Sequence, residues 1–281
     1  MILIADGGST KTDWRLIKEG REYKQIQTSG FNPYLVGSDE IEEILWKELQ
    51  PYIDNNAVSA VYYYGAGCST PVKIMIVETA FEKIFINARL YISHDLLAAS
   101  HALCGDKEGI AAILGTGSNS CYYDGKDIQD GIFSLGYFFG DEGSGAYLGK
   151  QLITAFLHKE LPEEIAIKLR EAYPMSLENI LDAVYTKPAP SRFLASFSNF
   201  INENRDHPFI YKLIADAFRA FYKYQICCYT KHKDVPVHFV GSVAYHYQDI
   251  ISLIGREFGV KTGKFIKAPI DGLVEYHHEN Q

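Results

Sequence analysis

The chain has 281 residues, of which 47% are hydrophobic and 22% are charged, with a formal net charge of −8. This length and composition fit one large globular domain or two lobes, with ample material for a core. The acidic balance argues against a protein whose main task is to coat nucleic acid or an anionic membrane, although anions can still bind locally. We therefore expect neither a nucleic acid nor a membrane as partner.

The N-terminus, the apolar runs and the cysteines bear on where the protein is located and on whether it binds metal through thiols. The chain enters an apolar stretch at once, without the basic segment, long apolar core and cleavage site of a signal peptide. No uninterrupted apolar run reaches the roughly 18 residues that a membrane-spanning helix needs. The five cysteines, an odd number, show neither a C-x-x-C pair nor a metal-binding spacing. We expect a cytoplasmic protein whose cysteines are core or surface thiols.

The first hundred residues alternate between strand and helix patterns. After the opening apolar run, residues 13–18 and 22–27 predict an antiparallel pair of strands joined at Glu19-Gly20. Period and length then predict helices at 39–50, 71–85 and 96–103 and strands at 58–64 and 90–93. The order βββαβαβ predicts a mixed sheet with helices on its faces.

The second half opens with a similar pattern and then departs from it. Strands at 120–123 and 128–132 are followed by helical segments at 144–158, 163–173, 177–185, 192–204 and 208–232. The pattern ends with a strand at 235–240, a helix at 247–257 and a strand at 264–267. We predict a duplicated fold with lobes at 1–117 and 118–281 and a helical insertion at about 144–232. The charged tail at 275–279 predicts a solvated terminal helix that packs back on the first lobe.

Two glycine-rich polar turns, each following a short apolar run, carry the functional signal. They are Asp6-Gly7-Gly8-Ser9-Thr10-Lys11-Thr12 and Gly115-Thr116-Gly117-Ser118-Asn119-Ser120. A strand that stops at glycines lets the backbone bend sharply, so that N–H groups and nearby hydroxyls can surround phosphate oxygens. Two such turns, about one α/β domain apart, predict a nucleotide held from both sides by two lobes.

Together with a third motif, these turns carry a resemblance. The third motif is Gly140-Asp141-Glu142-Gly143-Ser144-Gly145. The three resemble the BadF/BadG/BcrA/BcrD-type ATPase family and, within it, the N-acetylglucosamine kinases. That family belongs to the actin, hexokinase and sugar-kinase superfamily, whose two lobes close over a sugar and ATP. The resemblance spans nearly the whole chain; it is strongest over residues 1–150 and poor through the helical stretch. It implies an α/β fold of two ribonuclease-H-like lobes, each βββαβαβα, and a homodimer.

The resemblance assigns the first turn and its counterparts to Mg²⁺ and ATP. Asp6 ends a strand at the mouth of the first turn, where a carboxylate helps to hold hydrated Mg²⁺; the alternative is a turn-capping aspartate. Lys11 could equally be a solvated residue of the strand meander. Residues implied to bind the nucleotide are Gly7, Gly8, Ser9, Thr10, Lys11, Thr12, Gly115, Thr116, Gly241 and Ser242.

Asp95 is the predicted catalytic base. It follows the strand at 90–93 and precedes a helix, which is where the superfamily keeps the carboxylate that deprotonates the sugar hydroxyl. The alternative is an ordinary helix N-cap, a role that aspartate often fills. His94 is a second candidate base, although strand alternation points it away from Asp95.

Five residues are implied to bind the sugar: Asn32, Asp95, Ser118, Asn119 and Asp141. Asn32 precedes Pro33, so a simple turn role weighs equally with a sugar contact. Asp141 or Glu142 could instead cap the helix that follows Ser144, but two acids among small residues favour a site floor. An aromatic at position 137 could pack on a sugar, yet a buried strand aromatic is the favoured interpretation.

Three functions are compatible with these residues and with the resemblance. The leading one is an ATP-dependent kinase that transfers the γ-phosphoryl group of Mg-ATP to the 6-hydroxyl of N-acetylglucosamine or a related amino sugar. The first alternative is an ATPase that activates a partner enzyme through a shared iron–sulfur cluster, for which the cysteine pattern gives no support. The second is a nucleotide or sugar sensor without turnover, which Asp95 disfavours. The Cys-rich motif of the repressor/ORF/kinase group is missing, so we expect no zinc.

Overall fold

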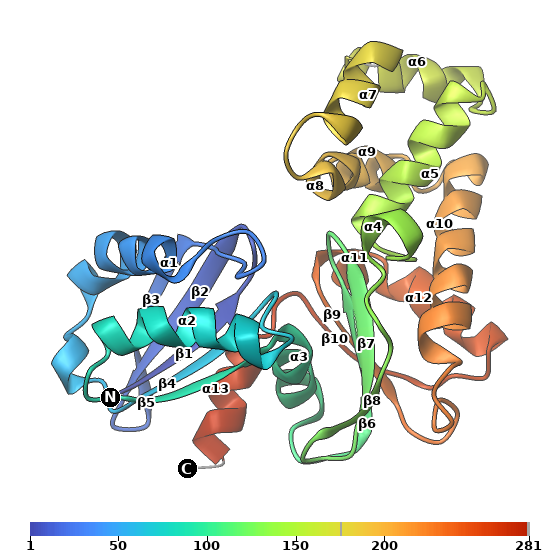
Figure 1. The fold of residues 1–281 in the computed structure, drawn as a ribbon. Helices are drawn as coiled ribbons and strands as arrows, with labels where there is room; N and C mark the ends of the chain where they lie inside the picture. The colour runs from blue at the N-terminus through green and yellow to red at the C-terminus, as the bar shows by residue number, and fades with distance from the viewer. Residues whose placement is uncertain (175, 280–281) are drawn as a thin grey trace. The chain divides into compact units, whose positions relative to one another are not determined.

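The computed structural model describes residues 1–174 and 176–279, and the chain divides into two compact units (Figure 1). Unit 1 comprises Met1–Asp106 and Ala268–Gln281, and unit 2 comprises Lys107–Lys267. The lobe boundary predicted after residue 117 is therefore wrong. Strand β6 (Gly109–Leu114) pairs with strands on both of its sides in the second sheet, so the strand before the second glycine-rich turn belongs to unit 2.

Unit 1 is built on a mixed sheet with the strand order β3-β2-β1-β4-β5. The strands are β1 (Ile2–Gly7), β2 (Lys11–Lys18), β3 (Arg21–Ser29), β4 (Ala60–Gly65) and β5 (Arg89–His94). The first three form an antiparallel meander, and β4 and β5 run parallel to β1. The β2–β3 connection is the predicted Glu19-Gly20 turn, in which both residues have positive φ, as a two-residue hairpin requires.

Helices cover both faces of this sheet. They are α1 (Ser38–Ile44) with its π-helical and 3₁₀ continuations (Leu45–Leu49, Gln50–Tyr52), α2 (Pro71–Ile84), α3 (Asp95–Cys104) and α13 (Ile270–Glu279), with a 3₁₀ turn at Asn55–Ala57. One face packs Trp14, Tyr63 and Phe81 into the larger core with α1 and α2. The opposite face buries a smaller core that includes Ile4 and Leu273.

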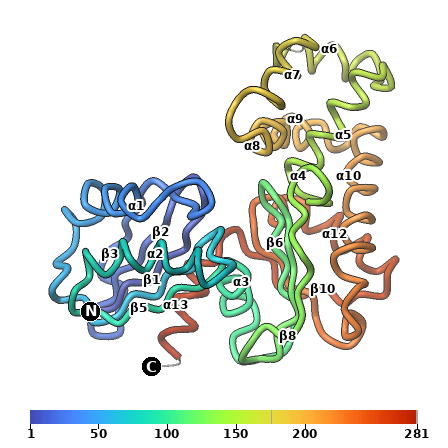
Figure 2. Tube along the Cα trace, viewed as in Figure 1, coloured from blue at the N-terminus to red at the C-terminus, as the bar shows by residue number. Residues whose placement is uncertain are grey.

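The last helix returns to unit 1, as the sequence predicted (Figure 2). Arg15 of β2 forms an ion pair with Asp271 at 3.1 Å, and the Tyr64 hydroxyl lies 3.0 Å from His277 Nε2. The expectation of a solvated helix is wrong on one side, because His277 is buried against β4. Within the described residues, no group of three or more His, Cys, Asp or Glu side chains is arranged to hold a metal ion.

Unit 2 repeats the sheet of unit 1, with the order β10-β9-β6-β7-β8. Its other strands are β7 (Ser118–Tyr123), β8 (Ile128–Gly131), β9 (Val237–Val240) and β10 (Thr262–Ile266). Read from β8, this order and the strand directions match β3-β2-β1-β4-β5, which confirms the predicted duplication.

The helical insertion lies between β8 and β9. It contains α4 (Gly136–Phe139), α5 (Gly145–Leu157), α6 (Glu163–Ala172), α7 (Leu177–Tyr185), α8 (Pro190–Ala195), α9 (Ser198–Glu203), α10 (Pro208–Phe221) and the π-helical segment η4 (Tyr222–Ile226). Two short helices, α11 (Ser242–His246) and α12 (Gln248–Glu257), follow β9. The interpretation of residue 137 as a strand aromatic is wrong, because residues 136–139 form a helical turn on which Phe138 and Phe139 are 66% and 76% exposed.

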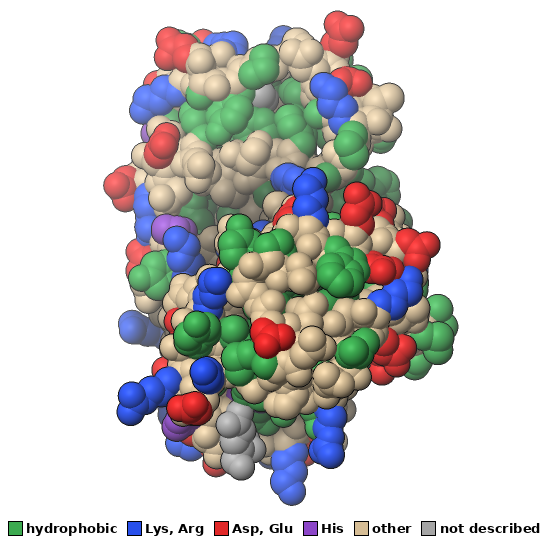
Figure 3. All heavy atoms as spheres, turned by 90° about the vertical axis from the view of Figure 1, so that its left-hand side faces the viewer, with side chains coloured by type: hydrophobic (Ala, Val, Ile, Leu, Met, Phe, Trp, Pro, Cys, Tyr) green, Lys and Arg blue, Asp and Glu red, His purple; other side chains and the backbone are tan. Residues whose placement is uncertain are grey.

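The surface carries charges of both signs. On the face drawn in Figure 3, Lys and Arg side chains lie among Asp and Glu side chains and form no continuous stripe. None of the helices in residues 1–174 and 176–279 has both the length and the apolar character needed to cross a membrane.

Candidate active site

The carboxyl ends of three parallel strands in unit 1 meet at one edge of the sheet. In the register of β1, β4 and β5, Gly7 pairs with Gly65 and Gly65 pairs with His94. Asp6 therefore lies at the end of β1, and Asp95 begins α3 directly after β5. Ligands of open α/β sheets bind at this edge, so the sheet topology brings the two predicted carboxylates to the expected place.

Asp6 carries the clearest electrostatic signal in unit 1. The pKa of this carboxyl group is raised to about 7, mainly by burial and further by the negative charges of Asp13 and Asp95, against an opposing effect of Lys11. The shift means that the site disfavours another negative charge and would accept a cation. Mg²⁺ prefers carboxylate oxygens and commonly binds through only one or two of them. Asp6 thus fits the predicted metal role.

Asp95 lies at the N-terminus of α3, where its Oδ1 accepts the Leu96 N–H at 2.9 Å. Burial raises the pKa of this carboxyl group, while His94 and the backbone N–H groups oppose the shift. His94 occupies the N-cap position and makes no side-chain capping bond, so Asp95 is the first residue of the helix rather than its cap. Burial lowers the pKa of His94.

The first glycine-rich turn is shaped by packing as well as by its predicted ligand. A Cβ at either Gly7 or Gly65 would collide with the ring of Tyr63, which lies buried beneath the turn. The Gly8 N–H donates to the Lys11 carbonyl at 2.9 Å and closes the turn. Ser9 and Thr10 are exposed at its tip, whereas Thr12 is fully buried and cannot present its hydroxyl to solvent.

The side chains of Lys11 and Asn32 both contact neighbouring residues of unit 1. The Lys11 ammonium pairs with Asp13 at 2.8 Å on the exposed surface of β2, which is the arrangement expected for a solvated meander residue. Asn32 Oδ1 accepts the Tyr34 N–H at 2.9 Å, which is a turn role. Its Nδ2 donates to Ser9 Oγ at 3.2 Å, so Asn32 also reaches the first glycine-rich turn. The turn interpretation of Asn32 is confirmed, and its contact with the sugar stays a prediction.

The second glycine-rich turn, in unit 2, is closed by a hydrogen bond from the Gly115 N–H to the Gly117 carbonyl at 3.0 Å. Gly241 lies against it, since a Cβ there would collide with the Leu114 carbonyl, and its φ of 120° excludes most other residues. Thr116 is exposed. The structure thus brings together the two segments of unit 2 that were predicted to bind nucleotide.

Asp141 turns back onto this segment. It is buried with a φ of 56°, and its Oδ1 accepts the Ser118 N–H at 3.2 Å. Burial raises the pKa of this carboxyl group; the Ser118 N–H opposes the shift and Glu142 adds to it. The capping alternative is wrong for both acids, because Ser144 caps α5 with a bond from the Tyr147 N–H to Ser144 Oγ at 3.1 Å.

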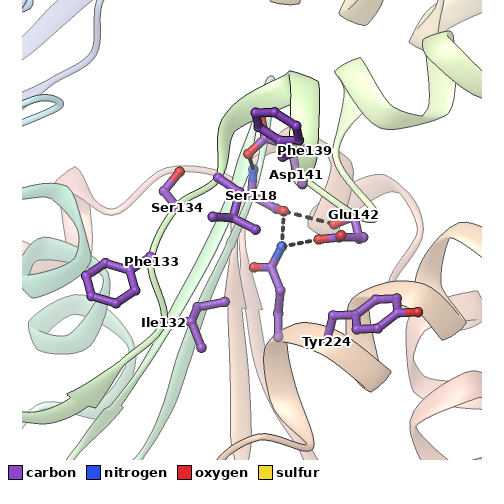
Figure 4. A pocket seen from close by; sticks show the side chains of 11 residues that line it. Ser118, Ile132, Phe133, Ser134, Phe139, Asp141, Glu142 and Tyr224 are labelled. Carbon is purple, nitrogen blue, oxygen red and sulfur yellow. Dashed lines mark hydrogen bonds between the residues drawn. The ribbon is translucent and has the colours of Figure 1, made fainter.

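A pocket of about 660 Å³ lies beside these residues (Figure 4). It is lined by Ser118, Ile132, Phe133, Ser134, Leu135, Phe139, Gly140, Asp141, Glu142, Tyr224 and Gln225. Asn119 is not part of this lining, since successive strand residues point to opposite faces, and its Oδ1 accepts the Ser120 N–H at 2.9 Å. Ser118 thus lines the pocket and Asn119 does not, and the predicted sugar contacts of both residues stay predictions.

Sequence reasoning missed Gln225. The Gln225 side chain is 4% exposed, and its Nε2 donates to Ser118 Oγ at 2.7 Å and to Glu142 Oε2 at 3.0 Å. The available signal was a polar residue within an apolar helical pattern, since its neighbours Phe221, Tyr222 and Ile226 are all buried.

Solved structures decide the family. A proposed N-acetylglucosamine kinase from Porphyromonas gingivalis is 43% identical to this chain, with a TM-score of 0.95, and the match covers 100% of this chain and 99% of that one. The chain belongs to this family of N-acetylglucosamine kinase-like sugar kinases. No protein-family model and no curated protein matches it.

Two more distant structures with this fold are also named as sugar kinases. A proposed N-acetylglucosamine kinase from Chromobacterium violaceum is 18% identical, with a TM-score of 0.65 and coverage of 98% of both chains. A ROK-family glucokinase from Streptomyces griseus, solved with glucose and AMPPNP, is 15% identical, with a TM-score of 0.58 and coverage of 98% and 97%. At these identities the likeness shows a shared two-lobe α/β fold. The narrower BadF/BadG/BcrA/BcrD assignment stays a prediction.

Proposed function

We propose that this sugar kinase transfers the γ-phosphoryl group of ATP to the 6-hydroxyl of N-acetylglucosamine or a closely related amino sugar. The observation that carries the proposal is the placement of Asp6 and Asp95 at the same sheet edge of unit 1. The choice of sugar is supported by the 43% identity to a proposed N-acetylglucosamine kinase over the full chain.

Asp95 is the proposed base. Because burial raises the pKa of its carboxyl group, the carboxylate is a better proton acceptor than an exposed aspartate. It takes the proton of the sugar hydroxyl as that oxygen bonds to the γ-phosphorus. The bond from the γ-phosphorus to the β–γ bridging oxygen then breaks, and ADP leaves with the electron pair.

The two glycine-rich turns are proposed to bind the nucleotide. In unit 1 the exposed hydroxyls of Ser9 and Thr10 and the backbone N–H groups of the turn suit phosphate oxygens. In unit 2 the turn at Gly115 and Thr116 adjoins Gly241, with Ser242 following at the start of α11. Lys11 remains a proposed phosphate contact only if it leaves its ion pair with Asp13.

Asp6 is proposed to hold Mg²⁺. Burial is the main cause of the raised pKa of Asp6, and the negative charges of Asp13 and Asp95 add to it; a divalent cation bound here would stabilise the ionised carboxylate. The described residues contain no three-acid cluster, so a Mg²⁺ ion held by Asp6 would also keep water and phosphate ligands. When bound, Mg²⁺ would neutralise charge on the phosphates.

The test is ADP release by the purified protein with Mg-ATP against a panel of sugars. The panel contains N-acetylglucosamine, glucosamine, N-acetylmannosamine and glucose, and ³¹P NMR identifies the phosphorylated position. Stimulation by an N-acetylated hexosamine with a 6-phosphate product supports the proposal. Hydrolysis that no sugar stimulates would favour the partner-coupled ATPase, and sugar binding without turnover would favour a sensor. Sedimentation of the same preparation tests the proposed homodimer.

A further inference from the structure

Gln225 belongs to an irregular turn of helix that faces the sugar-site residues of unit 2. Helix α10 continues into the π-helical segment η4, and Gln225 is one of the buried residues of that segment. The extra residue of a π-turn changes which side chains face inward, and such turns occur frequently at functional sites. Here the inward position is taken by a polar carboxamide, which lines the 660 Å³ pocket.

The backbone and the side chain of Gln225 attach to the same strand. The Ser120 hydroxyl donates to the Gln225 carbonyl at 2.7 Å, and the Gln225 Nε2 donates to Ser118 Oγ at 2.7 Å. Ser118 and Ser120 are two residues apart in β7 and therefore share one face of the strand. This pair of bonds holds η4 against the strand that follows the second glycine-rich turn.

The hydrogen bonds fix the orientation of the carboxamide. Its second Nε2 hydrogen reaches Glu142 Oε2 at 3.0 Å, and an ionised carboxylate can only accept. The Ser118 hydroxyl donates its hydrogen to the Glu142 backbone carbonyl at 2.9 Å, so its oxygen accepts the hydrogen bond from Gln225. Both N–H groups are thus used, and one residue joins the second glycine-rich turn to the Gly140–Gly145 motif.

The other end of the carboxamide shows that stability alone does not explain Gln225. Among the described residues, its Oε1 is a buried oxygen with no hydrogen-bond partner. An unsatisfied buried acceptor is unfavourable, and an apolar side chain of similar length would avoid it. The gain must therefore lie in what the two N–H groups hold in place.

We propose that Gln225 is a positioning residue for sugar binding, which fixes the Ser118 hydroxyl and the Glu142 carboxylate toward the pocket. The inference rests on the proposed function, because it takes the sugar as the ligand of this pocket. Without the two N–H donors, Glu142 and Ser118 lose their common anchor, and the sugar meets a less ordered set of partners. The effect falls on binding rather than on proton transfer, which belongs to Asp95 in unit 1.

The test measures N-acetylglucosamine binding by isothermal titration calorimetry, without nucleotide, for the wild type, Gln225→Met and Gln225→Glu. Both variants remove the N–H donors, and Gln225→Glu adds a negative charge facing Glu142. We expect Kd to rise about tenfold in Gln225→Met and at least as much in Gln225→Glu. Tm of Gln225→Met should change by less than about 3 °C, because the variant loses two stabilising hydrogen bonds but also removes a destabilising unsatisfied oxygen. In turnover assays KM should rise while kcat stays within about threefold.

Lys223→Met is the matched control, because Lys223 lies exposed on the same segment outside the pocket lining, and its Kd should equal that of the wild type. In a Ser118→Ala background, Gln225→Met should raise Kd less than it does alone, since the two residues share a bond. If the wild type binds the sugar and a folded Gln225 variant binds it with the same Kd, the inference is overturned and the proposed function stands. Absence of sugar binding and turnover in the wild type would instead overturn the proposed function, and the inference with it.

Discussion

The two sheets share one topology and differ in the chemistry at their strand ends. In unit 1 the central strand β1 ends with Asp6 and Gly7, and β5 is followed by Asp95. In unit 2 the corresponding strand β6 ends with the buried Leu114, and β10 is followed by Lys267. Among the described residues, both units thus have a glycine-rich turn after the central strand, whereas Asp6 and Asp95 have no acidic counterpart at the corresponding positions of unit 2.

The two acids that line the pocket of unit 2, Asp141 and Glu142, come from a different part of its fold. The segment between the third and fourth strands holds α1 and short helical turns in unit 1, whereas in unit 2 it is the long insertion from α4 to η4. Asp141, Glu142 and Gln225 all belong to that insertion. We therefore propose that unit 1 supplies the reactive groups and that the insertion of unit 2 supplies binding groups.

The largest expected effect is the loss of the base. Asp95→Asn keeps the size of the side chain and an oxygen for the Leu96 N–H, but cannot accept the sugar proton. We expect kcat to fall about 10³-fold with little change in the KM of the sugar. The matched control, Asp106→Asn, alters an exposed aspartate beyond the C-terminus of α3 and should leave kcat unchanged. Retention of a tenth of the activity in Asp95→Asn would remove Asp95 from its role.

Asp6→Asn should separate activity from stability. The folded pKa of about 7 lies above the ordinary value of 3.8, so ionised Asp6 costs stability as the pH rises through this range. The variant should lose about 100-fold in kcat/KM through weaker Mg²⁺ binding, and nucleotide-free protein should gain roughly 3 °C in Tm at pH 8. Thermal unfolding at pH 5 and pH 8 checks this, because the gain should shrink at pH 5. A lower Tm at pH 8 would contradict the interpretation.

In unit 2, Asp141→Asn tests whether the insertion serves binding. Asparagine tolerates the positive φ of this position and keeps an acceptor for the Ser118 N–H, so the fold should persist. Loss of the charge should raise the KM of the sugar about tenfold and lower kcat by a smaller factor. Steady-state kinetics decide between this outcome and a pure kcat effect, which would place Asp141 among the reactive groups instead.

Acid sensitivity is an expected effect on stability that both units share. Burial lowers the pKa of His101 and His277 in unit 1 and of His238 in unit 2 to about 4, with smaller effects of His277 on His101 and of Lys264 on His238. The unfolded chain binds these protons near pH 6.5, so stability is full above that pH and falls toward pH 4. At pH 5 each histidine should cost about 1–2 kcal/mol.

Tm measured at pH 7 and pH 5 checks the sign. His277→Gln, which keeps a polar group near the Tyr64 hydroxyl, should show a smaller loss between the two pH values than the wild type does. An equal loss in the variant would mean that His277 does not titrate in this range.

The sequence alone determined the features that depend on local physics. Strand alternation, helical period and the Glu19-Gly20 turn placed nearly all elements of both sheets, because each is set by residues a few positions apart. Asp6 and the two glycine-rich turns were selected in the same way, since a strand end followed by glycines is visible in the chain, whereas Asp95 was selected through the resemblance to sugar kinases. The sequence also predicted the duplication, which the matching sheet orders confirm.

Only the tertiary structure decided the features that depend on distant partners. The unit boundary moved because β6 pairs with β9, more than a hundred residues away, and the last helix owes its buried face to β4. Thr12 and Asn119 fit a polar motif, but packing under the turn and strand direction set where they point. Gln225 is meaningful only beside Ser118 and Glu142, which are 107 and 83 residues away in the chain. Local patterns specify elements, whereas long-range hydrogen bonds and burial specify which side chains meet in the site.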